Sequence, residues 1–325
     1  MRRVRYHQYG GPEVLQIEDA AEPDPGPGQV RLRTEVVGAN FVDTKLRRGG
    51  PEDSIFHRPV PNTLTGDVVG TIDAVGEGVS ADRIGERAAG LSEDAFADAA
   101  VVDEQWLAPV PDGIADADAT MLPMAAPIAL RLPRLARLEP GETVLIDAAA
   151  GGIGHLAVQI AKHVLGAGTV IATAGSAAKL DFVRGLGADV AVDYTEPDWA
   201  DRVRAAAPGG VDVLLDSIGG EVFRQELGLL APFGRAVVYG AADGALASVS
   251  VGELFALKSV AGYSLLGLRA AAPGLARADI TEATGYLASG RVRTALHASF
   301  KLSEAPQAHE VLEARANLGR VLVYP

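Results

Sequence analysis

Residues 143–162, TVLIDAAAGGIGHLAVQIAK, constrain the fold more than any other stretch of the chain. Val144-Leu145-Ile146 is a short continuous apolar run with β-branched ends, which is typical of a strand buried on both faces of a parallel sheet. A glycine-rich turn follows at once. Apolar residues then recur at helical spacing, at Ile153, Leu156, Ala157, Ile160 and Val164. The pattern predicts a strand, a tight turn and a helix, as at the start of a doubly wound α/β domain.

The turn fits the dinucleotide-binding fingerprint G-x-G-x-x-G with one departure. Ala149, Gly151 and Gly154 take its three positions, and Gly152 and Ile153 separate the last two. The second position lacks a side chain so that the backbone can approach a pyrophosphate, and the third lets helix and strand pack closely. Because free N–H groups at a helix N-terminus favour an anion, we expect these five residues to bind a dinucleotide. Alanine at the first position is acceptable if it keeps a negative φ, and a turn without a ligand is the alternative.

The end of the next expected strand, residues 169–173, favours NADPH over NADH. An enzyme that uses NAD carries an acid about 20 residues after the glycines, for the ribose 2′-hydroxyl. Here the chain reads Ala174-Gly175-Ser176, and Lys179 follows one turn later. A hydroxyl and a cation without a carboxylate suit a 2′-phosphate. The alternatives are an N-cap role for Ser176 and a solvated surface role for Lys179.

Composition excludes several classes of protein. With 325 residues, of which 48% are hydrophobic and 22% charged, the chain is long and apolar enough for two globular domains. A net charge of −13 disfavours a nucleic-acid partner. The sequence has no cysteine, which excludes disulfides, thiolate nucleophiles and Cys-ligated zinc. The first residues have no apolar run of the kind found in signal peptides, and no segment is apolar enough to span a membrane, so we expect a cytoplasmic protein.

The first 120 residues differ in pattern from those that follow. Short apolar runs are cut by glycine and proline, and residues 22–28, EPDPGPG, form a turn-rich connector. This pattern is typical of an antiparallel, barrel-like β domain. Long helical periodicity first appears over residues 117–138. We therefore expect a domain change near Ala119 and one helix leading into the strand at Val144.

Several separate motifs carry a family resemblance. They are YGGPEVL (9–15), GANFVD (38–43), GDVVG (66–70), AAAGGIG (148–154), LASGRV (287–292), FKLSEA (300–305) and GRV (319–321). In this order and spacing they resemble the zinc-free quinone oxidoreductases of the medium-chain dehydrogenase/reductase superfamily, which include zeta-crystallin. The resemblance implies an α/β protein with a GroES-like β-barrel from residues 1–119 and 267–325. It also implies a Rossmann domain, residues 120–266, with a doubly wound parallel six-stranded sheet, and an active site between the domains.

The sequence supplies the matching strands at 144–146, 169–173, 190–192, 211–215, 236–238 and 260–262, and a helix at 179–186. The resemblance implies further cofactor contacts at the strand ends and near the C-terminus, at Tyr194, Ser217, Gly240, Ala241, Gly262, Tyr263 and Asn317. For three positions the structural alternatives are a rim aromatic at Tyr194, a turn cap at Asp216 and a plain turn residue at Asn317.

The resemblance also assigns Asn40 and Asp43 to the substrate region. The Asn40 amide is expected to donate to a substrate carbonyl, and Asp43 to bond nearby ribose or backbone groups. The alternative is that Asn40 satisfies backbone groups in a barrel loop.

Zinc is not expected. Gly66 stands where zinc-dependent relatives carry the histidine of a Gly-His-Glu motif, and His155, His163 and His309 fall in expected helices without ligand spacing. Without a Lewis acid, alcohol–aldehyde interconversion is disfavoured. A quinone or a conjugated enone needs less help, because conjugation already activates the carbon that accepts hydride.

Two departures from the family pattern bear on the substrate. No tyrosine follows Arg48-Gly49-Gly50-Pro51, and the segment up to Gly66 is long, so Phe56 and His57 either line a new pocket or lie in a surface loop. Residues 125–128 read Ala-Ala-Pro-Ile in place of Gly-x-Thr-Ala, and Pro127 inside a helix is expected to kink it.

Three functions remain open. They are an NADPH-dependent reductase of quinones or enones, a specialised enoyl or polyketide-tailoring reductase on the same fold, and a non-catalytic NADPH-binding protein. Relatives pair their sixth strands across a two-fold axis, so the resemblance implies a homodimer through residues 259–264.

Overall fold

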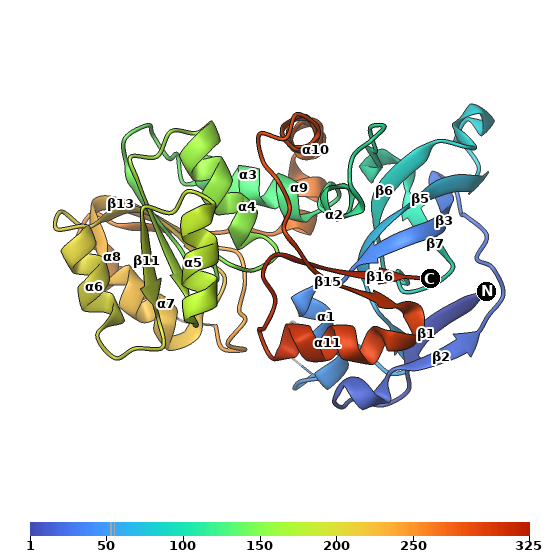
Figure 1. The fold of residues 1–325 in the computed structure, drawn as a ribbon, viewed down its shortest axis with the longest axis horizontal. Coiled ribbons are helices and arrows are strands. Elements are labelled where there is room, and N and C mark those ends of the chain that lie inside the picture. The colour runs from blue at the N-terminus through green and yellow to red at the C-terminus, as the bar shows by residue number, and fades with distance from the viewer. Residues whose placement is uncertain (53, 55, 247) are drawn as a thin grey trace. The chain divides into compact units, whose positions relative to one another are not determined.

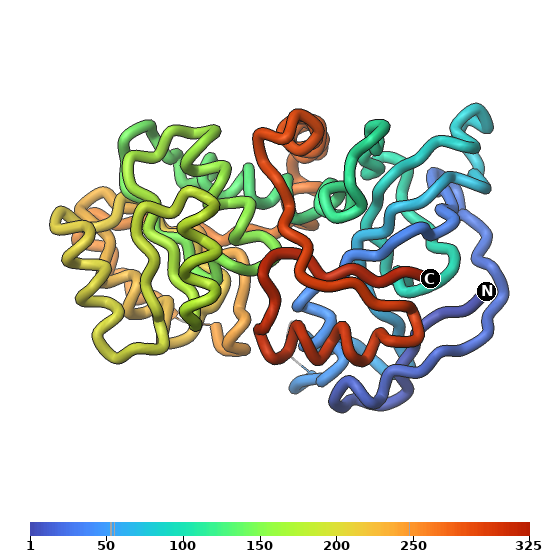
Figure 2. Tube along the Cα trace, viewed as in Figure 1, coloured from blue at the N-terminus to red at the C-terminus, as the bar shows by residue number. Residues whose placement is uncertain are grey.

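The structure, a computed structural model, describes residues 1–52, 54, 56–246 and 248–325. They form two compact units, Met1–Met124 with Ile280–Pro325, and Ala125–Asp279 (Figure 1). Both chain termini belong to the first unit, as the course of the chain shows (Figure 2). The sequence-based boundaries near residues 119 and 266 stay a proposal, because compactness alone does not define a functional domain.

The first unit contains two sheets. The larger runs in the order β15-β16-β3-β5-β6-β8, with β7 also paired to β3. Its strands are β3 (Gln29–Gly38), β5 (Gly66–Val75), β6 (Arg87–Ser92), β7 (Ala99–Asp103), β8 (Ala108–Pro109), β15 (Leu296–Lys301) and β16 (Arg320–Tyr324). The smaller contains β2 (Gln16–Asp19), β1 (Arg2–Tyr6) and β4 (Asn62–Thr63). Helices of this unit are η1 (Pro12–Val14), α1 (Phe41–Arg48), η2 (Ala81–Arg83), η3 (Glu104–Trp106), α2 (Asp116–Ala119), η5 (Leu302–Glu304) and α11 (Ala305–Glu313).

The C-terminal strand completes the N-terminal sheet. β16 pairs antiparallel with β3, with Leu322 opposite Gly38. On β3, Val30 and Leu32 alternate toward a core that also holds Val323 of β16. Apolar side chains at every second residue bury one face of a strand, so the pattern itself directs these residues inward. The C-terminal residues thus belong to the same sheet as the N-terminal strands, and their assignment to one functional domain stays a prediction.

The second unit is built on a parallel sheet in the order β11-β10-β9-β12-β13-β14. Its strands are β9 (Thr143–Ile146), β10 (Thr169–Ala174), β11 (Val190–Asp193), β12 (Val211–Asp216), β13 (Leu230–Val238) and β14 (Ser259–Gly262). Its helices are α3 (Ala125–Leu135), α4 (Gly154–Gln159) with a π-helical turn at Ile160–Val164, α5 (Ala177–Gly185), α6 (Trp199–Ala206), α7 (Gly220–Leu227), α8 (Val251–Leu254) and α9 (Leu265–Ala271); α10 (Pro273–Ala288) runs on into the first unit. All six expected strands are present, and β13 begins earlier than expected.

Helices cover both faces of this sheet (Figure 1). Leu145 of β9 and Leu214 of β12 share one core with Trp199 of α6 and with Phe223 and Leu227 of α7. The neighbouring residues of β9 are also buried and face the other side, where α3 and α4 pack. A strand covered on both faces needs a continuous apolar run, which is why residues 144–146 lack polar side chains.

The prediction of one continuous helix over residues 117–138 is wrong for the middle of that stretch. The chain forms α2 and α3 as separate helices and turns through residues 120–124 between them. Pro123 has no N–H with which to extend α2.

The prediction that Pro127 lies inside a helix and kinks it is also wrong. Pro127 is the third residue of α3, in the first turn, where no intrahelical partner exists for an N–H. The proline inside α3 is Pro133, and the helix ends two residues later. Within the described ranges, no helix has the length and apolar character needed to cross a membrane.

Candidate active site

The turn after β9 has the geometry that the fingerprint requires. Ala148 takes a positive φ of 41°, and Ala149 is not among the described residues with positive φ. The Ala149 N–H donates to the Thr173 carbonyl at 3.1 Å, and the Gly151 N–H donates to the Ala148 carbonyl at 2.9 Å. Ala149 therefore keeps the negative φ that an alanine at the first fingerprint position needs. The left-handed conformation falls on Ala148 instead.

The glycines of this turn differ in the space around them. A Cβ on Gly154 would lie 2.5 Å from the Ala148 oxygen and 2.7 Å from the Ala149 Cα, so this glycine allows helix and strand to touch. A Cβ on Gly151 would meet the Ala148 oxygen at 3.1 Å, and one on Gly152 would meet nothing within 4 Å. The outer side of the turn is therefore open to a ligand.

The same turn offers backbone donors to that ligand. Among the described residues, no acceptor is bound by the N–H groups of Gly152, Ile153 and Gly154. They stand at the N-terminal end of α4, where the helix dipole favours an anion. The residues present therefore fit the pyrophosphate of a dinucleotide.

Other predicted cofactor residues lie at the same edge of the sheet. The strand order reverses between β9 and β12, and ligands of doubly wound sheets bind outside the carboxyl ends of the strands at such a point. Ser217 follows β12, and a Cβ on Gly240 would lie 2.7 Å from the Ser217 oxygen. Ala241, the next residue after Gly240, is buried. A Cβ on Gly262, the last residue of β14, would meet nothing within 4 Å.

Tyr263 sits next to Gly262 and is anchored by its backbone. Its N–H donates to the Val238 carbonyl at 2.9 Å. Its hydroxyl is buried, has no hydrogen-bond partner among the described residues, and has its pKa raised to about 12 by burial and then by Asp279. The backbone of this residue is thus fixed at the strand end, as a main-chain contact to a cofactor requires.

Predicted 2′-phosphate residues cluster at the ends of β10 and β11. The Ser176 hydroxyl accepts from the Lys179 N–H at 3.4 Å and caps α5, so the capping alternative holds for Ser176. A Cβ on Gly175 would lie 3.4 Å from the Tyr194 hydroxyl, which places that hydroxyl beside the end of β10. No acidic residue occurs between Ala174 and Lys179. The segment after β10 therefore offers a hydroxyl and a lysine without an acid, while Asp193, opposite Ala174 at the end of β11, accepts from the Thr195 N–H and hydroxyl.

In the first unit, Asn40 belongs to a buried ion-pair network. Its Nδ2 donates to Asp67 Oδ2 at 3.0 Å, and its Oδ1 accepts from Arg320 Nη1 at 2.9 Å. Arg320 Nη2 lies 2.6 Å from Asp67 Oδ2, with the two side chains 3% and 0% exposed. A Cβ on Gly38 would lie 1.6 Å from Arg320 Nη2, so Gly38 makes room for the guanidinium. The Asn40 amide thus bonds to two side chains rather than to the backbone groups of a barrel loop, and its catalytic role remains a prediction.

Asp43 and Asn317 have local partners in this unit. The fully buried Asp43 carboxyl accepts from the Thr65 N–H at 2.8 Å and from its hydroxyl at 3.0 Å. Burial raises the pKa of Asp43 to about 7. Asn317 Nδ2 donates to the Gly319 carbonyl at 2.9 Å, as expected of a turn residue.

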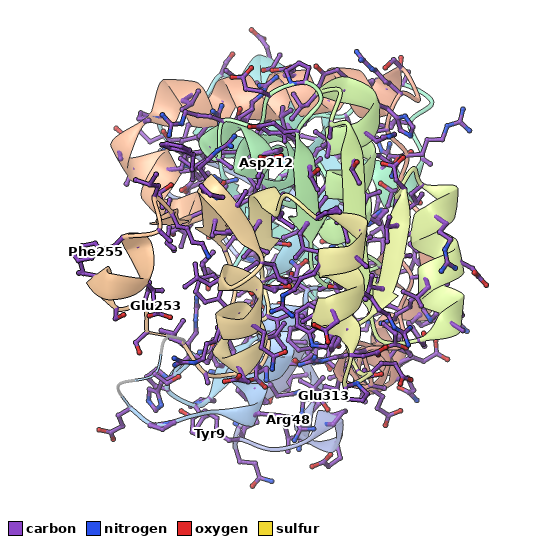
Figure 3. All side chains as sticks on the ribbon, turned by 90° about the vertical axis from the view of Figure 1, so that its left-hand side faces the viewer. Tyr9, Arg48, Asp212, Glu253, Phe255 and Glu313 are labelled. Carbon is purple, nitrogen blue, oxygen red and sulfur yellow. The ribbon has the colours of Figure 1, made fainter. Side chains whose placement is uncertain are left out.

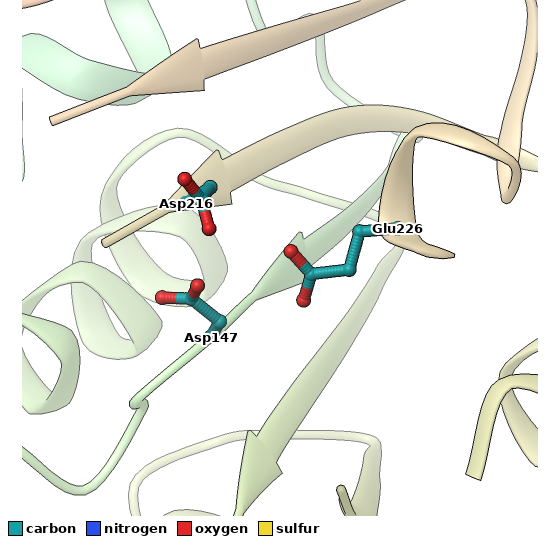
Figure 4. A group of neighbouring side chains, drawn as sticks. All are labelled: Asp147, Asp216 and Glu226. Atoms are coloured by element: carbon teal, nitrogen blue, oxygen red, sulfur yellow. The ribbon is translucent and has the colours of Figure 1, made fainter. Parts of the chain in front are cut away.

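Sequence reasoning missed a group of buried acids in the second unit. Asp147, Asp216 and Glu226 are fully buried, and one oxygen from each lies within 4.8 Å of the others (Figure 4). The expectation that Asp216 caps a turn is confirmed, because its Oδ1 accepts from the N–H groups of Ile218 and Gly219 at 3.2 and 3.0 Å. A signal existed for Asp147, which directly follows the apolar run of β9, and for Glu226, which lies three residues after the buried Phe223.

The histidines in helices make local contacts. His155 Nδ1 lies 2.8 Å from the Gly151 carbonyl oxygen, and His163 Nε2 lies 3.2 Å from that of Leu186. His309 Nδ1 lies 3.3 Å from Arg47 Nε, and burial followed by the Arg47 charge lowers the pKa of His309 to about 3. In the described part of the chain, the side chains close enough together to hold a metal are the three buried acids, and they do not belong to the unit of Gly66.

The segment after α1 is tied to its own unit. Arg48 donates two hydrogen bonds to Glu313 of α11, at 2.9 and 2.7 Å (Figure 3). His57 Nδ1 lies 3.1 Å from the Gly50 carbonyl oxygen, and the His57 ring centroid lies 5.9 Å from that of Tyr9. The Phe56 N–H donates to Ser54 Oγ at 3.2 Å. Residues 53 and 55 lie outside the described residues, and the predicted pocket role of Phe56 and His57 stays a prediction.

Two family models match this chain. Residues 26–112 match the alcohol dehydrogenase GroES-like domain, and residues 152–278 match the zinc-binding dehydrogenase domain. The quinone oxidoreductase of Pseudomonas aeruginosa is 34% identical over 331 residues, which cover all of this chain and 99% of that protein.

Solved structures agree with this similarity. The Escherichia coli quinone oxidoreductase complexed with NADPH superposes with a TM-score of 0.88 at 29% identity, and both chains are covered completely. The CurK enoyl reductase gives a TM-score of 0.88 at 29% identity, with 99% of this chain and 98% of that chain covered. The chain therefore belongs to the quinone oxidoreductase family of the medium-chain dehydrogenase/reductase superfamily, and it is an oxidoreductase.

Proposed function

We propose that this oxidoreductase transfers hydride from NADPH to a quinone or a conjugated enone, without a zinc ion. The observation that carries the proposal is the open turn at the sheet's switch point. The N–H groups of Gly152, Ile153 and Gly154 stand there and bind no acceptor in the described part of the chain, and no acid occurs between Ala174 and Lys179. The NADPH complex of the related Escherichia coli enzyme supports the same cofactor.

In this proposal, different residues of the second unit bind different parts of NADPH. The N–H groups of residues 152–154 bind the pyrophosphate, and Ser176, Lys179 and Tyr194 surround the 2′-phosphate. Backbone groups at Gly240, Ala241, Gly262 and Tyr263 contact the ribose and nicotinamide, and Ser217 lies beside them. When bound, NADPH supplies the hydride.

The residues of the first unit bind the acceptor in this proposal. Asn40, held in place by Asp67 and Arg320, donates an amide N–H to the acceptor's oxygen, and Asp43 fixes the start of α1 through Thr65. The donor set does not fit zinc. Gly66 offers no ligand atom and the chain has no thiolate. A conjugated acceptor removes the need for a Lewis acid, because its electrophilic carbon accepts hydride directly.

The test is NADPH oxidation followed by absorbance, with quinones and enones as acceptors. NADPH should be oxidised faster than NADH. Lys179→Ala should raise the KM for NADPH about tenfold or more and leave that for NADH unchanged, since a lost charged contact to phosphate is worth about 1.4 kcal/mol or more. Arg204→Ala, which removes an exposed cation of α6, is the matched control. Equal use of NADH and NADPH would contradict the cofactor assignment.

A second function is favoured by the similarity to the CurK enoyl reductase. In that case, an enoyl thioester or a polyketide-like enone should be reduced at a kcat/KM far above that for simple quinones. A panel containing both classes separates the two functions. Tight NADPH binding with no turnover on any acceptor would indicate the non-catalytic alternative.

We also propose a homodimer that forms through β14, in a cytoplasmic protein. β14 is the last strand in the sheet order and is paired with β13 on one side. An unpaired strand edge is a template for pairing with a second chain. Phe255, just after α8, is 79% exposed and points away from the body of its unit (Figure 3), and Leu257 is 57% exposed. Light scattering should give a dimer; a monomer at micromolar concentration would refute this.

A further inference from the structure

Three carboxyl groups meet inside the second unit, and no described residue pairs a cation with them. They come from three elements, since Asp147 follows β9, Asp216 ends β12 and Glu226 lies on α7 (Figure 4). Within the described residues, none of them forms an ion pair. Both Glu226 oxygens and Asp216 Oδ2 are buried and accept no hydrogen bond there. Figure 4 shows the Glu226 side chain reaching toward the two aspartates.

Such a group cannot be fully ionised. Two carboxylates at close range repel each other, and an unpaired charge in the interior costs several kcal/mol. Burial raises the pKa of all three, and the neighbouring carboxylates raise those of Asp147 and Glu226 further. An oxygen of Asp147 and one of Asp216 lie within 4.8 Å of each other, and two carboxyl groups can bond to each other when one holds a proton.

One path leads from this cluster toward the ligand edge. Asp147 Oδ1 accepts from the Ser217 hydroxyl at 2.8 Å, and the Asp147 carboxyl also holds the Ser217 and Ile218 N–H groups at 3.0–3.2 Å. Ser217 is half-buried, whereas the three acids are fully buried. Because β9 and β12 flank the switch point, this hydroxyl stands where a doubly wound sheet places its ligand.

We propose that the cluster of Asp147, Asp216 and Glu226 shares at least one proton at neutral pH and supplies, through the Ser217 hydroxyl, the proton that the reduction consumes. This inference rests on the proposed function. Hydride from NADPH brings two electrons to the conjugated carbon and leaves negative charge on the acceptor oxygen. The Ser217 hydroxyl, which donates to Asp147 in the resting structure, turns to give its proton to that oxygen, a protonated Asp147 carboxyl returns one to Ser217, and the cluster regains a proton from water. The sum is acceptor, NADPH and one proton giving reduced acceptor and NADP⁺.

Titratable groups face the cluster from the elements that pack around it, namely β9, β12, α7 and β13. They are the three acids themselves and Tyr239, which follows β13 and whose pKa is raised by burial and then by Asp147. Because the pKa values of the three carboxyl groups are raised, the cluster loses its protons at a higher pH than free carboxyl groups do. The rate constant kcat should therefore fall on the alkaline side.

Infrared spectroscopy of the cofactor-free protein tests the protonation directly. At pH 7 the C=O band of a protonated carboxylic acid should be present, and Glu226→Gln should weaken or shift it. Glu221→Gln is the matched control, because Glu221 lies on the same helix and its side chain is 69% exposed. Absence of the band, or one equivalent of a divalent cation per chain in elemental analysis, would overturn the proposal.

Enzyme kinetics test the delivery. Ser217→Ala should lower kcat about tenfold or more and flatten its alkaline fall, because positioned proton donors contribute at least that much. Ser217→Thr keeps a hydroxyl and should restore both. A merely structural role would lower kcat equally at every pH. If Ser217→Ala matches wild type in rate and profile, the delivery is refuted and the proposed function survives. If the acid band is present but no acceptor oxidises NADPH, both are refuted.

Discussion

The glycine turn allows one comparison in which the structure sets both the sign and the size of an effect. Gly152 and Gly154 lie two residues apart in the same turn and differ in the space around them. A Cβ on Gly154 would lie 2.5 Å from the Ala148 oxygen, 2.7 Å from the Ala149 Cα and 3.0 Å from the Ala149 carbonyl carbon. A Cβ on Gly152 would meet no atom within 4 Å. Neither glycine has a positive φ, so alanine is permitted by the backbone at both positions.

The magnitude follows from what the new methyl group meets. At Gly154 all three close atoms are backbone atoms, and the shortest contact is half an ångström below the 3.0 Å limit of observed contacts. The start of α4 must therefore move away from β9. Overpacking of this kind costs about 1–3 kcal/mol. For a unit of this size that lowers Tm by roughly 2–12 °C. Gly152→Ala restricts the unfolded chain without a clash, so its effect should lie between zero and a gain of about 1 kcal/mol.

Thermal and urea denaturation of both variants measure the difference, and NADPH binding by fluorescence shows whether the turn still holds the pyrophosphate. Gly154→Ala should melt earlier and bind NADPH more weakly, because its N–H groups move with the helix start. Gly152→Ala should keep the wild-type melting temperature. A Gly154→Ala variant as stable as the wild type, or a Gly152→Ala variant less stable than Gly154→Ala, would contradict this difference in packing.

Three further outcomes are expected. Gly151→Val should abolish NADPH binding while circular dichroism stays unchanged; normal binding would show that the fingerprint is misplaced. The pKa of Asp43 is about 7 in the folded state and near 4 in the unfolded state. The free energy of unfolding should therefore fall by up to about 4 kcal/mol as pH rises from about 4 to 7. Asp43→Asn should remove this pH dependence in urea denaturation. Arg320→Met leaves Asp67 buried and unpaired and should cost about 3–5 kcal/mol by urea denaturation, whereas Arg202→Met, at an exposed i,i+4 pair, should cost less than about 1 kcal/mol.

The sequence predicts the second unit well because its signals are local. Each strand of the sheet is a short apolar run bounded by turn residues, and each lies within one βα unit. A buried parallel strand must be apolar on both faces, so strand position can be inferred without knowing its neighbours. The helix at 117–138 failed for the same reason. Helical periodicity continues across Pro123, but the proline removes the N–H that a continuous helix needs.

The partners of Asn40 could not be predicted locally. Arg320 lies 280 residues from Asn40 and 253 from Asp67, and β16 brings it against β3. Nothing in the residues around Asn40 indicates that its amide will meet a buried ion pair. Gly38 is the one nearby signal, because a residue without a Cβ in a strand often marks a close approach. Here the approaching group is the Arg320 guanidinium.

The acid cluster, by contrast, follows from alternation along the strands and from one helix face. Leu145 and Asp147 are two residues apart, as are Leu214 and Asp216, so each acid points to the same side of the sheet as its leucine. Those leucines pack against α7 through Phe223 and Leu227, and Glu226 lies on the same helical face. Three acids on one buried face cannot all be charged. Apolar residues would fill these positions at a lower free-energy cost of burial. The two aspartates also accept from the N–H groups of residues 217–219, so the buried carboxyl groups shape the loop at the carboxyl end of β12. Because these carboxyl groups exchange protons, the geometry of the loop at the carboxyl ends of the strands depends on pH. A reduction that consumes a proton at this edge is therefore coupled to the protonation of the cluster.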